Sequence, residues 1–447
     1  MAATRHAGFQ ANHSFMSTAS SARRQPPGPD TPLDLEKQPD KLETLGRLWR
    51  HYGDCYRVPA ESREVDTWVV NDPALIRRIL VTNHRNYTKG IGIERIRVLL
   101  GNGLMTSEGD TWRRQRRQMQ SGFHRPGVEA CLPLFLDVAQ QQASSWQRAA
   151  RSAEAVNVTE AVSEAALEVI LRALFSADLA DIPAQSFELV SKHSNRDLQF
   201  AVKFRALGKL IQGFIERRRK ENDYPVDLLT HTLQAVDRSS GEGMSDRQVI
   251  DEMLTLIVAG HETTAATLNW AWYLLAAHPD SMRRVVDEAG QLNLDSLDSI
   301  ALESLAYTRA VVQEALRLYP PGWLYTRQAL NEDQLGPYTL PAGSDVFICS
   351  YLLHRHPDYW EQAEAFDPNR FLGDANWERY AYLPFSAGPR HCIGETFANM
   401  EMLVHLAVIA AQVSPELPGK KAIELDADVN LRPRHPLRLK FRVNSHG

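Results

Sequence analysis

The feature that most constrains the fold is a long apolar stretch that begins at Ser245 and ends before Pro279. The order Ser245-Asp246-Arg247-Gln248 is typical of a capping box, in which a serine and a glutamine side chain close the first turn of a helix. From there one helix can continue to about His278, where Pro279 stops it. Its apolar residues fall on all faces: Leu254, Leu256, Ile257, Val258, Trp270, Trp272, Leu274 and Leu275. A helix without a polar face belongs in a core, so the chain must build a deep protein interior around it.

The rest of the chain is rich in helical patterns and poor in strand signals. Asn71-Asp72-Pro73 opens a helix with a capping residue and a proline in the first turn. Short apolar runs beside turn residues predict strands only near residues 65–70, 338–340 and 346–349. We therefore expect a mostly α fold with small β-sheets.

The chain of 447 residues shows no repeat, no low-complexity linker and no abrupt change of composition. This favours one domain, placed at residues 30–447. Residues 1–28 contain no acidic residue, and a disordered extension at 1–29 is the preferred interpretation, with an organelle transit peptide as the alternative. The proline-rich stretch at 25–29 separates this extension from the folded body.

Composition excludes several classes of protein. The formal net charge of -5 offers no basic excess to neutralise the phosphates of a nucleic acid. The four cysteines form no CxxC pair, so neither a disulfide framework nor a zinc site is expected, and a reducing compartment, the cytoplasm, is predicted. The most apolar helical run, residues 402–413, is too short for a membrane anchor and contains His405.

The strongest chemical signal is a loop of ten residues, Phe385-Ser386-Ala387-Gly388-Pro389-Arg390-His391-Cys392-Ile393-Gly394. Glycines beside a cysteine allow a tight turn that directs N–H groups at the sulfur. An apolar helix follows from about Glu395, and the positive potential at its start favours a thiolate. A thiolate is a strong axial donor to heme iron, and Arg390 is placed to pair with a carboxylate such as a heme propionate.

For a lone cysteine, a packing role at a loop–helix junction would be the better interpretation. Here the residues follow the order FxxGxRxCxG, which is complete at every defining position: Phe385, Gly388, Arg390, Cys392 and Gly394. In this loop the chain resembles the cytochrome P450 family. The resemblance implies a single heme-enclosing domain, heme b as the cofactor and Cys392 as the iron ligand.

The centre of the long helix carries Ala259-Gly260-His261-Glu262-Thr263-Thr264. A glycine, two threonines and a charged glutamate disfavour a buried helix, and such local conflicts often mark functional sites. Gly260 would leave room for a small ligand, and the Thr263 hydroxyl can replace a backbone group. The segment resembles the family's AGxxTT oxygen-activation segment, which implies that Glu262 and Thr263 relay protons. A kinked helix with Glu262 reaching the surface is the alternative.

Glu314 and Arg317 share one face of a helix expected from about residue 302 to 318, a pair that alone is usually a solvated ion pair. Downstream, Phe366-Asp367-Pro368-Asn369-Arg370-Phe371 is similar to the family's PERF-type motif, with Asn369 where a glutamate is usual. The resemblance implies one buried network of Glu314, Arg317 and Arg370 that supports the heme pocket.

Two further segments resemble heme-propionate contacts of the family. Trp112 and Arg116 match its WxxxR pattern, and Arg327 follows Pro320-Pro321 where another propionate partner is often found. Arg113, Arg114 and Arg117 form either a basic patch for an acidic electron donor or an ordinary solvated helix face.

The resemblance also implies where a substrate would lie. Mostly apolar candidates for the pocket lining predict an apolar or amphipathic substrate. These candidates are Ile91 and Ile93 within the stretch 91–104, Val258, Ala259, Trp323 and Leu324. Between Leu179 and Ile215 the chain is shorter than the family's usual lid, which predicts a reduced or open cap that could admit a bulky or carrier-tethered substrate.

The predicted function is that of a heme-thiolate monooxygenase, which inserts one oxygen atom from O2 into a small organic molecule. Electrons from NAD(P)H would arrive through separate proteins, a ferredoxin with its reductase or a flavodoxin-type donor. Two alternatives remain: a peroxide-driven variant on the same fold, and a non-catalytic heme-binding or substrate-binding recruitment protein.

Overall fold

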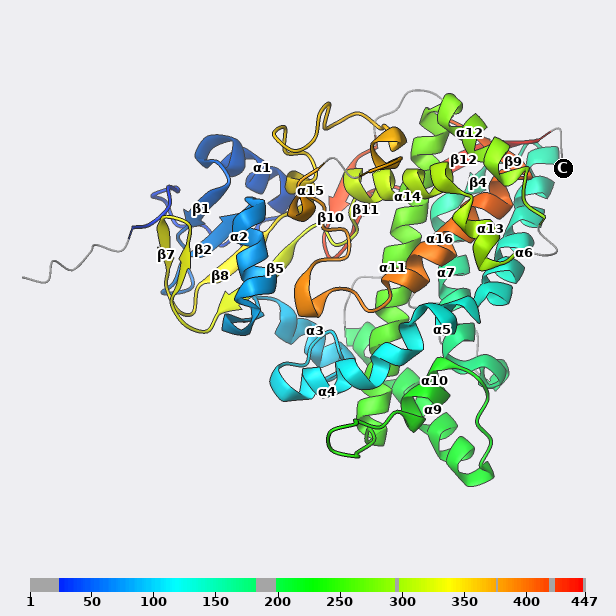
Figure 1. The fold of residues 1–447 in the computed structure, drawn as a ribbon, viewed down its shortest axis with the longest axis horizontal. Helices are drawn as coiled ribbons and strands as arrows, with labels where there is room; N and C mark the ends of the chain where they lie inside the picture. Colours follow the sequence, from blue (N-terminus) through cyan, green and yellow to red (C-terminus); the bar gives the residue numbers. More distant parts are fainter. Residues whose placement is uncertain (1–23, 182–197, 294–296, 375–376, 418–422, 445–447) are drawn as a thin grey trace, which may run out of the picture.

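The computed structural model describes residues 24–181, 198–293, 297–374, 377–417 and 423–444. A part made of long helices lies beside a smaller part that carries most of the strands, and α11 runs through the helical part (Figure 1). The expectation of a mostly α fold with small sheets is confirmed. The α-helices are α1 (Lys41–Tyr52), α2 (Pro73–Arg77), α3 (Ile93–Leu100), α4 (Gly109–Gln120), α5 (Arg125–Glu129), α6 (Leu132–Arg151), α7 (Val158–Phe175), α9 (Leu198–Glu221), α10 (Leu228–Gln234), α11 (Asp246–Ala277), α12 (Pro279–Ala289), α13 (Ser299–Glu303), α14 (Ala306–Leu318), α15 (Ser350–Leu353) and α16 (Glu395–Ala410).

The strands form four small sheets. The largest has the order β1-β2-β8-β5-β3, in which β2 and β8 run parallel and the other neighbours are antiparallel. The other sheets have the orders β4-β12-β9, β10-β11 and β6-β7. The strands are β1 (Cys55–Val58), β2 (Thr67–Val70), β3 (Tyr87–Lys89), β4 (Val156–Asn157), β5 (Tyr325–Ala329), β6 (Asp333–Leu335), β7 (Tyr338–Leu340), β8 (Asp345–Ile348), β9 (Val413–Glu416), β10 (Leu425–Ala427), β11 (Leu431–Pro433) and β12 (Arg438–Val443).

Helix α11 is the predicted apolar helix, and both of its ends are confirmed. At its start the Ser245 N–H donates to Gln248 Oε1 over 3.0 Å, and the Gln248 N–H donates to Ser245 Oγ over 3.4 Å. The 32-residue helix ends at Ala277, directly before Pro279 opens α12. It packs against α7, α9, α14 and α16, so its apolar surface is covered on several sides.

The helix expected near residues 302–318 is interrupted, because α13 ends at Glu303 and α14 starts at Ala306. The new start is capped from another helix: the Glu288 carboxylate on α12 accepts the backbone N–H groups of Tyr307 and Thr308 over 2.7 and 2.8 Å. A carboxylate at a helix N-terminus satisfies amides that lack partners within the helix. Local sequence does not contain this cap, so the break could not be predicted from it.

Residues 24–29 were expected to belong to the N-terminal extension, but they contact the folded body. Pro27 O accepts the Arg57 N–H of β1 over 2.9 Å, and Arg24 O accepts the Thr339 N–H of β7 over 3.0 Å. A Cβ at Gly28 would lie 1.9 Å from Arg57 O, so only glycine fits this approach. The folded body therefore begins by residue 24, and residues 1–23 lie outside the described part.

A buried ion pair on α14 holds together the segment that leads to the cysteine loop. Arg317 uses Nε and Nη2 to bind the two carboxylate oxygens of Glu314 over 2.6 and 2.7 Å, and both side chains are 0% exposed. Its remaining bonds go to backbone carbonyls, those of His354 at 2.8 Å, Ala363 at 2.7 Å and Ala365 at 3.0 Å. All five N–H groups of the guanidinium thus have an acceptor.

The Glu314 carboxylate also accepts hydrogen bonds from groups other than Arg317. Its Oε1 also accepts the Asp367 N–H over 2.9 Å and the Arg370 Nε–H over 3.2 Å. Asn369, which stands where the family usually has a glutamate, instead accepts a bond from Arg284 Nη1 over 2.8 Å. The structure therefore brings Glu314, Arg317 and Arg370 into one network between α14 and the chain at 363–370.

We predict that Glu314→Gln lowers the free energy of unfolding by about 3–5 kcal/mol, because it leaves the Arg317 charge buried without its counter-charge. Urea unfolding followed by tryptophan fluorescence measures the change. Glu424→Gln is the control, since it alters the exposed Arg434–Glu424 pair, whose side chains are 55% and 63% accessible. Equal losses in the two variants would contradict the role assigned to the buried network.

Candidate active site

The cysteine loop is held in a strained turn. Cys392 follows a short 3-10 helix (Gly388–Arg390) and precedes α16, and its N–H donates to Phe385 O over 3.0 Å. Gly388 has a φ of 73°, and a Cβ there would lie 1.9 Å from Leu80 O. Ser386 has a φ of 63°, a conformation that costs free energy for a residue with a side chain. The loop is therefore held tightly against the segment that follows α2.

Opposing effects act on the Cys392 thiol. Burial among protein atoms raises the pKa of the thiol, and the Gly394 N–H and the Arg116 guanidinium lower it. Burial also raises the pKa of Cys349 and of Cys55 to about 12 each, although the backbone N–H groups of Leu352 and Tyr351 and the Arg355 charge partly oppose it at Cys349. Although protein atoms surround its thiol, Cys392 has solvent-accessible surface and is the most accessible of the four cysteines. It is therefore the cysteine placed to act as a ligand.

Four basic side chains lie near this loop. Arg116 on α4 donates from Nη1 to His391 O over 2.8 Å. Arg390 lies 4.3 Å from the centre of the Trp112 ring, donates to Ser107 O over 3.2 Å and forms an ion pair with Glu108.

The other two basic residues face each other in the sheet, because Lys89 on β3 pairs in register with Arg327 on β5. Arg327 is buried, and burial together with the Arg390 charge lowers the pKa of its guanidinium to about 10. Burial, Arg327 and Arg390 lower the pKa of Lys89 to about 7, while Glu108 opposes the shift. Binding of an anion stabilises a cluster of cations that repel one another.

The centre of α11 carries the predicted oxygen-activation residues. Thr263 donates from Oγ1 to Ala259 O over 2.9 Å, and Thr267 donates from Oγ1 to Thr263 O over 2.9 Å. Glu262 accepts a bond from Asn430 Nδ2 over 2.6 Å. A Cβ at Gly260 would lie 2.9 Å from the Ile170 side chain, so this glycine serves the packing of α11 against α7.

With this geometry in view, comparison with known proteins decides the family. A sequence model described as Cytochrome P450 matches residues 33–441. The chain belongs to the cytochrome P450 family. Members of this family are heme-dependent monooxygenases with a cysteine thiolate on the iron.

Curated relatives from bacteria and a solved structure agree with this assignment. A cyclooctat-9-en-7-ol 5-monooxygenase of Streptomyces melanosporofaciens is 32% identical, with 86% of this chain and 90% of the relative covered. A pentalenene oxygenase of Streptomyces avermitilis is 31% identical over 90% of this chain and 93% of the relative. The crystal structure of a cytochrome P450DA heme domain superposes with a TM-score of 0.83 at 24% identity, covering 94% of this chain and 98% of that chain, and this shows the shared fold.

The residues of the site fit the heme that the P450 family binds. Cys392 would supply the sulfur ligand, and Arg116, Arg327, Arg390 and Lys89 would supply the positive charge that two propionates neutralise. A heme bound here would supply iron-centred activation of O2.

Sequence reasoning missed two residues that contact predicted site residues, Lys89 beside Arg327 and Asn430 beside Glu262. Lys89 lies in no motif, and its role follows from its strand pairing with Arg327. Asn430 lies between β10 and β11, 168 residues from its partner Glu262. No local sequence pattern predicts either residue, because the partner that each one contacts is distant in the chain.

Two carboxylates at the start of α11 were also missed, and they fix the loop between α3 and α4. Asp251 accepts the Asn102 N–H over 2.8 Å, and Glu252 accepts the Leu104 N–H over 2.9 Å. Burial raises the pKa of Glu252 to about 8. The loop from Gly101 to Ser107 is therefore bound to the same helix that carries Thr263.

The predicted pocket residues lie in different surroundings. Val258 and Ala259 are half-buried on α11, and Ile91, Ile93 and Leu324 are half-buried in the sheet-bearing part. Trp323 is 2% exposed within a core cluster, and its Nε1–H donates to Asp428 O over 3.0 Å. The predicted shortening of the lid, between Leu179 and Ile215, falls in part on residues 182–197, which lie outside the described part, and α9 begins directly after them.

The three arginines on the outer face of α4 have acidic partners. Arg113 pairs with Asp110, and Arg114 lies 3.6 Å from Glu242. Arg117 binds both carboxylate oxygens of Asp237, over 3.1 and 3.0 Å, and this bond lowers the pKa of that carboxyl. Each positive charge of this patch is therefore matched by a negative one.

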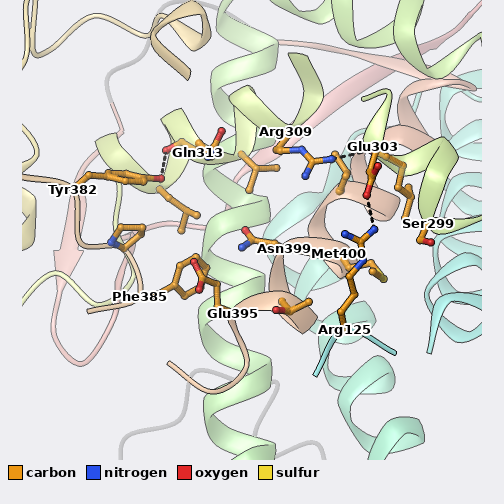
Figure 2. Close-up of a pocket in the computed structure, with 16 residues that line it drawn as sticks. Arg125, Ser299, Glu303, Arg309, Gln313, Tyr382, Phe385, Glu395, Asn399 and Met400 are labelled. Atoms are coloured by element: carbon orange, nitrogen blue, oxygen red, sulfur yellow. Dashed lines mark hydrogen bonds and ion pairs between the residues drawn. The ribbon is translucent and has the colours of Figure 1, made fainter. Parts of the chain in front are cut away.

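A hollow of about 340 Å³ lies beside the cysteine loop (Figure 2). Phe385 forms one wall, and Gln313 on α14 and Asn399 on α16 line it from the neighbouring helices. Arg125 and Glu303 form an ion pair at its side. Because Cys392 N–H is bonded to Phe385 O, this wall is part of the same loop that presents the ligand.

We predict that Gly388→Ala destroys the cysteine loop, because its Cβ would meet Leu80 O and its φ is unfavourable for alanine. The heme content and the absorption spectrum of the purified variant measure the loss. Gly373→Ala is a matched control: Gly373 has a φ of 82° but open space around its Cβ position, so backbone strain of about 1 kcal/mol is the expected cost. Normal heme content in Gly388→Ala would contradict this account.

Proposed function

We propose that this P450 binds heme b through Cys392 and inserts one oxygen atom from O2 into an apolar cyclic terpenoid. The observation that carries the proposal is the juxtaposition of the Cys392 thiol with the cluster of Arg116, Arg327, Arg390 and Lys89, which suits a dianionic heme. The relatives named for oxygenation of cyclooctat-9-en-7-ol and of pentalenene support the substrate class. The mostly apolar half-buried residues Val258, Ala259 and Leu324 are consistent with it.

The residues of the chain divide the work. Cys392 holds the iron, and the basic cluster neutralises the propionates and orients the ring. Glu262 and Thr263 sit at adjacent positions of α11, where a carboxylate can take a proton from water and a hydroxyl can pass one on. This pair favours O2-dependent chemistry over the peroxide-driven alternative, and it also speaks against a non-catalytic binding protein.

The decisive test is the absorption spectrum of the dithionite-reduced protein with carbon monoxide. We predict the strongly red-shifted Soret band of a thiolate-bound heme, which Cys392→Ser removes while Cys131→Ser, a substitution in another cysteine, retains it. Pentalenene and cyclooctat-9-en-7-ol are then tested for a spin-state shift and, with NADPH, a surrogate ferredoxin and its reductase, for hydroxylated or epoxidised product. A band typical of a histidine or thiol ligand would refute the assignment of Cys392.

Electrons are proposed to arrive from a separate ferredoxin or flavodoxin-type protein. Because the α4 arginines are already paired, we predict that reduction by an acidic surrogate ferredoxin depends only weakly on ionic strength. Stopped-flow reduction at rising NaCl concentration measures this. The double variant Asp237→Asn/Glu242→Gln frees Arg114 and Arg117 and is expected to react faster at low salt with a steeper salt dependence. A steep dependence in the unmodified protein would contradict the prediction.

A further inference from the structure

Glu262 makes a short contact with a part of the chain that the helix motif does not include. Its Oε2 accepts a hydrogen bond from Asn430 Nδ2 over 2.6 Å, and Asn430 lies in the turn between β10 and β11. Hydrogen bonds to a charged acceptor are short and stronger than those between neutral groups. The amide therefore sets a preferred position for the carboxylate.

The turn that carries Asn430 is firmly attached to its surroundings. The Trp270 indole on α11 donates to Leu431 O over 3.1 Å, and Leu431 N–H donates to Pro321 O over 3.1 Å. The Trp323 indole donates to Asp428 O over 3.0 Å, and Leu431 is fully buried. Asn430 thus sits between two anchored neighbours, so its position relative to α11 is fixed by the fold.

On the helix itself, Glu262 and Thr263 extend in directions about 100° apart, as consecutive residues of an α-helix do. Thr263 uses its hydroxyl to bond Ala259 O over 2.9 Å. The Glu262 carboxylate is directed instead toward the β10–β11 turn by Asn430. A proton transfer from Glu262 to Thr263 therefore begins with the carboxylate in the position that Asn430 favours.

We propose that Asn430 is a positioning residue of the proton relay: it holds the Glu262 carboxylate toward the β10–β11 turn, where the carboxylate exchanges protons with water before it rotates to deliver them to Thr263. This inference rests on the proposed monooxygenase function. Glu262 gains a proton from water and gives it to the Thr263 hydroxyl, which passes its own proton on toward the oxygen being reduced, so both side chains return to their starting states. The amide of Asn430 keeps its own protons throughout, because it does not ionise.

A neutral amide suits this role for a physical reason. A lysine or arginine at the same place would form an ion pair that resists release of the carboxylate, whereas an aliphatic side chain would remove the hydrogen bond that Asn430 donates to it. A single hydrogen bond from an amide orients the carboxylate and still allows the side chain to rotate between its staggered conformers.

The experiment compares Asn430→Ala with Val429→Ala in the holoenzyme. Val429 lies in the same turn, is 46% exposed and precedes Asn430 in the chain, so it is the matched control. The assay uses NADPH, a surrogate ferredoxin and its reductase, with pentalenene as the probe, or cyclooctat-9-en-7-ol if pentalenene leaves the spin state unchanged. The readouts are hydrogen peroxide released per NADPH and the solvent deuterium isotope effect on NADPH oxidation.

For Asn430→Ala we expect the ratio of peroxide to product to rise about tenfold, the factor that loss of one hydrogen bond to a charged group produces. The solvent isotope effect should increase, while Val429→Ala behaves like the unmodified enzyme. Asn430→Gln, which keeps an amide, should recover part of the coupling. Combining Asn430→Ala with Glu262→Gln should add little to Glu262→Gln alone, because both act on one step.

The inference is overturned if Asn430→Ala and Val429→Ala give the same peroxide ratio, or if the effects of Asn430→Ala and Glu262→Gln are additive. If Asn430→Ala does not retain the heme, Asn430→Asp and Asn430→Gln provide the comparison: the added carboxylate should uncouple the reaction and the amide should not. Equal coupling in these two would also overturn it. Failure of the proposed function itself would be seen in a different measurement: the unmodified protein would show no thiolate-type carbon monoxide band.

Discussion

The buried pair of Glu314 and Arg317 is the interaction on which the site depends. Removing two charges from water is costly, and the pair is tolerated because every donor of Arg317 and both oxygens of Glu314 have partners. These partners are mostly backbone groups of the chain at 354–367. From there, neutral His354 accepts the Leu383 N–H over 2.8 Å, and burial lowers the pKa of that histidine to about 3. His354 thus connects α14 to the start of the cysteine loop by hydrogen bonds.

The opposite situation holds on the other side of Cys392. Burial lowers the pKa of Arg327, Lys89 and Arg390, and the Arg390 charge lowers the pKa of the other two further, with Glu108 as partial compensation. Such a cluster opposes folding until an anion neutralises it, so cofactor binding and stability are linked. The charges of the Glu314–Arg317 network are therefore balanced within the chain, whereas the basic cluster would be balanced by the propionates of a bound heme.

Helix α11 connects both halves to the chemistry. Its first turns hold the loop after α3 through Asp251 and Glu252, and its centre carries Glu262 and Thr263. Its later part anchors the β10–β11 turn through Trp270. Most of the apolar side chains of α11 are buried in the protein core. Within the described ranges, no helix is both long and apolar enough to cross a membrane.

The sequence by itself determined the elements whose signals are local: the capping box and length of α11, the mostly α fold, the ordered loop around Cys392 and the spacing of Glu314 and Arg317. The sequence did not predict the features that depend on residues distant in the chain. The break before α14 depends on the cap from Glu288, and the contacts of residues 24–29 depend on β1 and β7. Lys89 and Asn430 are recognised only through their partners, Arg327 and Glu262. Periodicity and capping act over a few residues, whereas charge pairing and hydrogen bonding across the fold join residues whose separation along the chain carries no pattern. Only the tertiary structure could decide those.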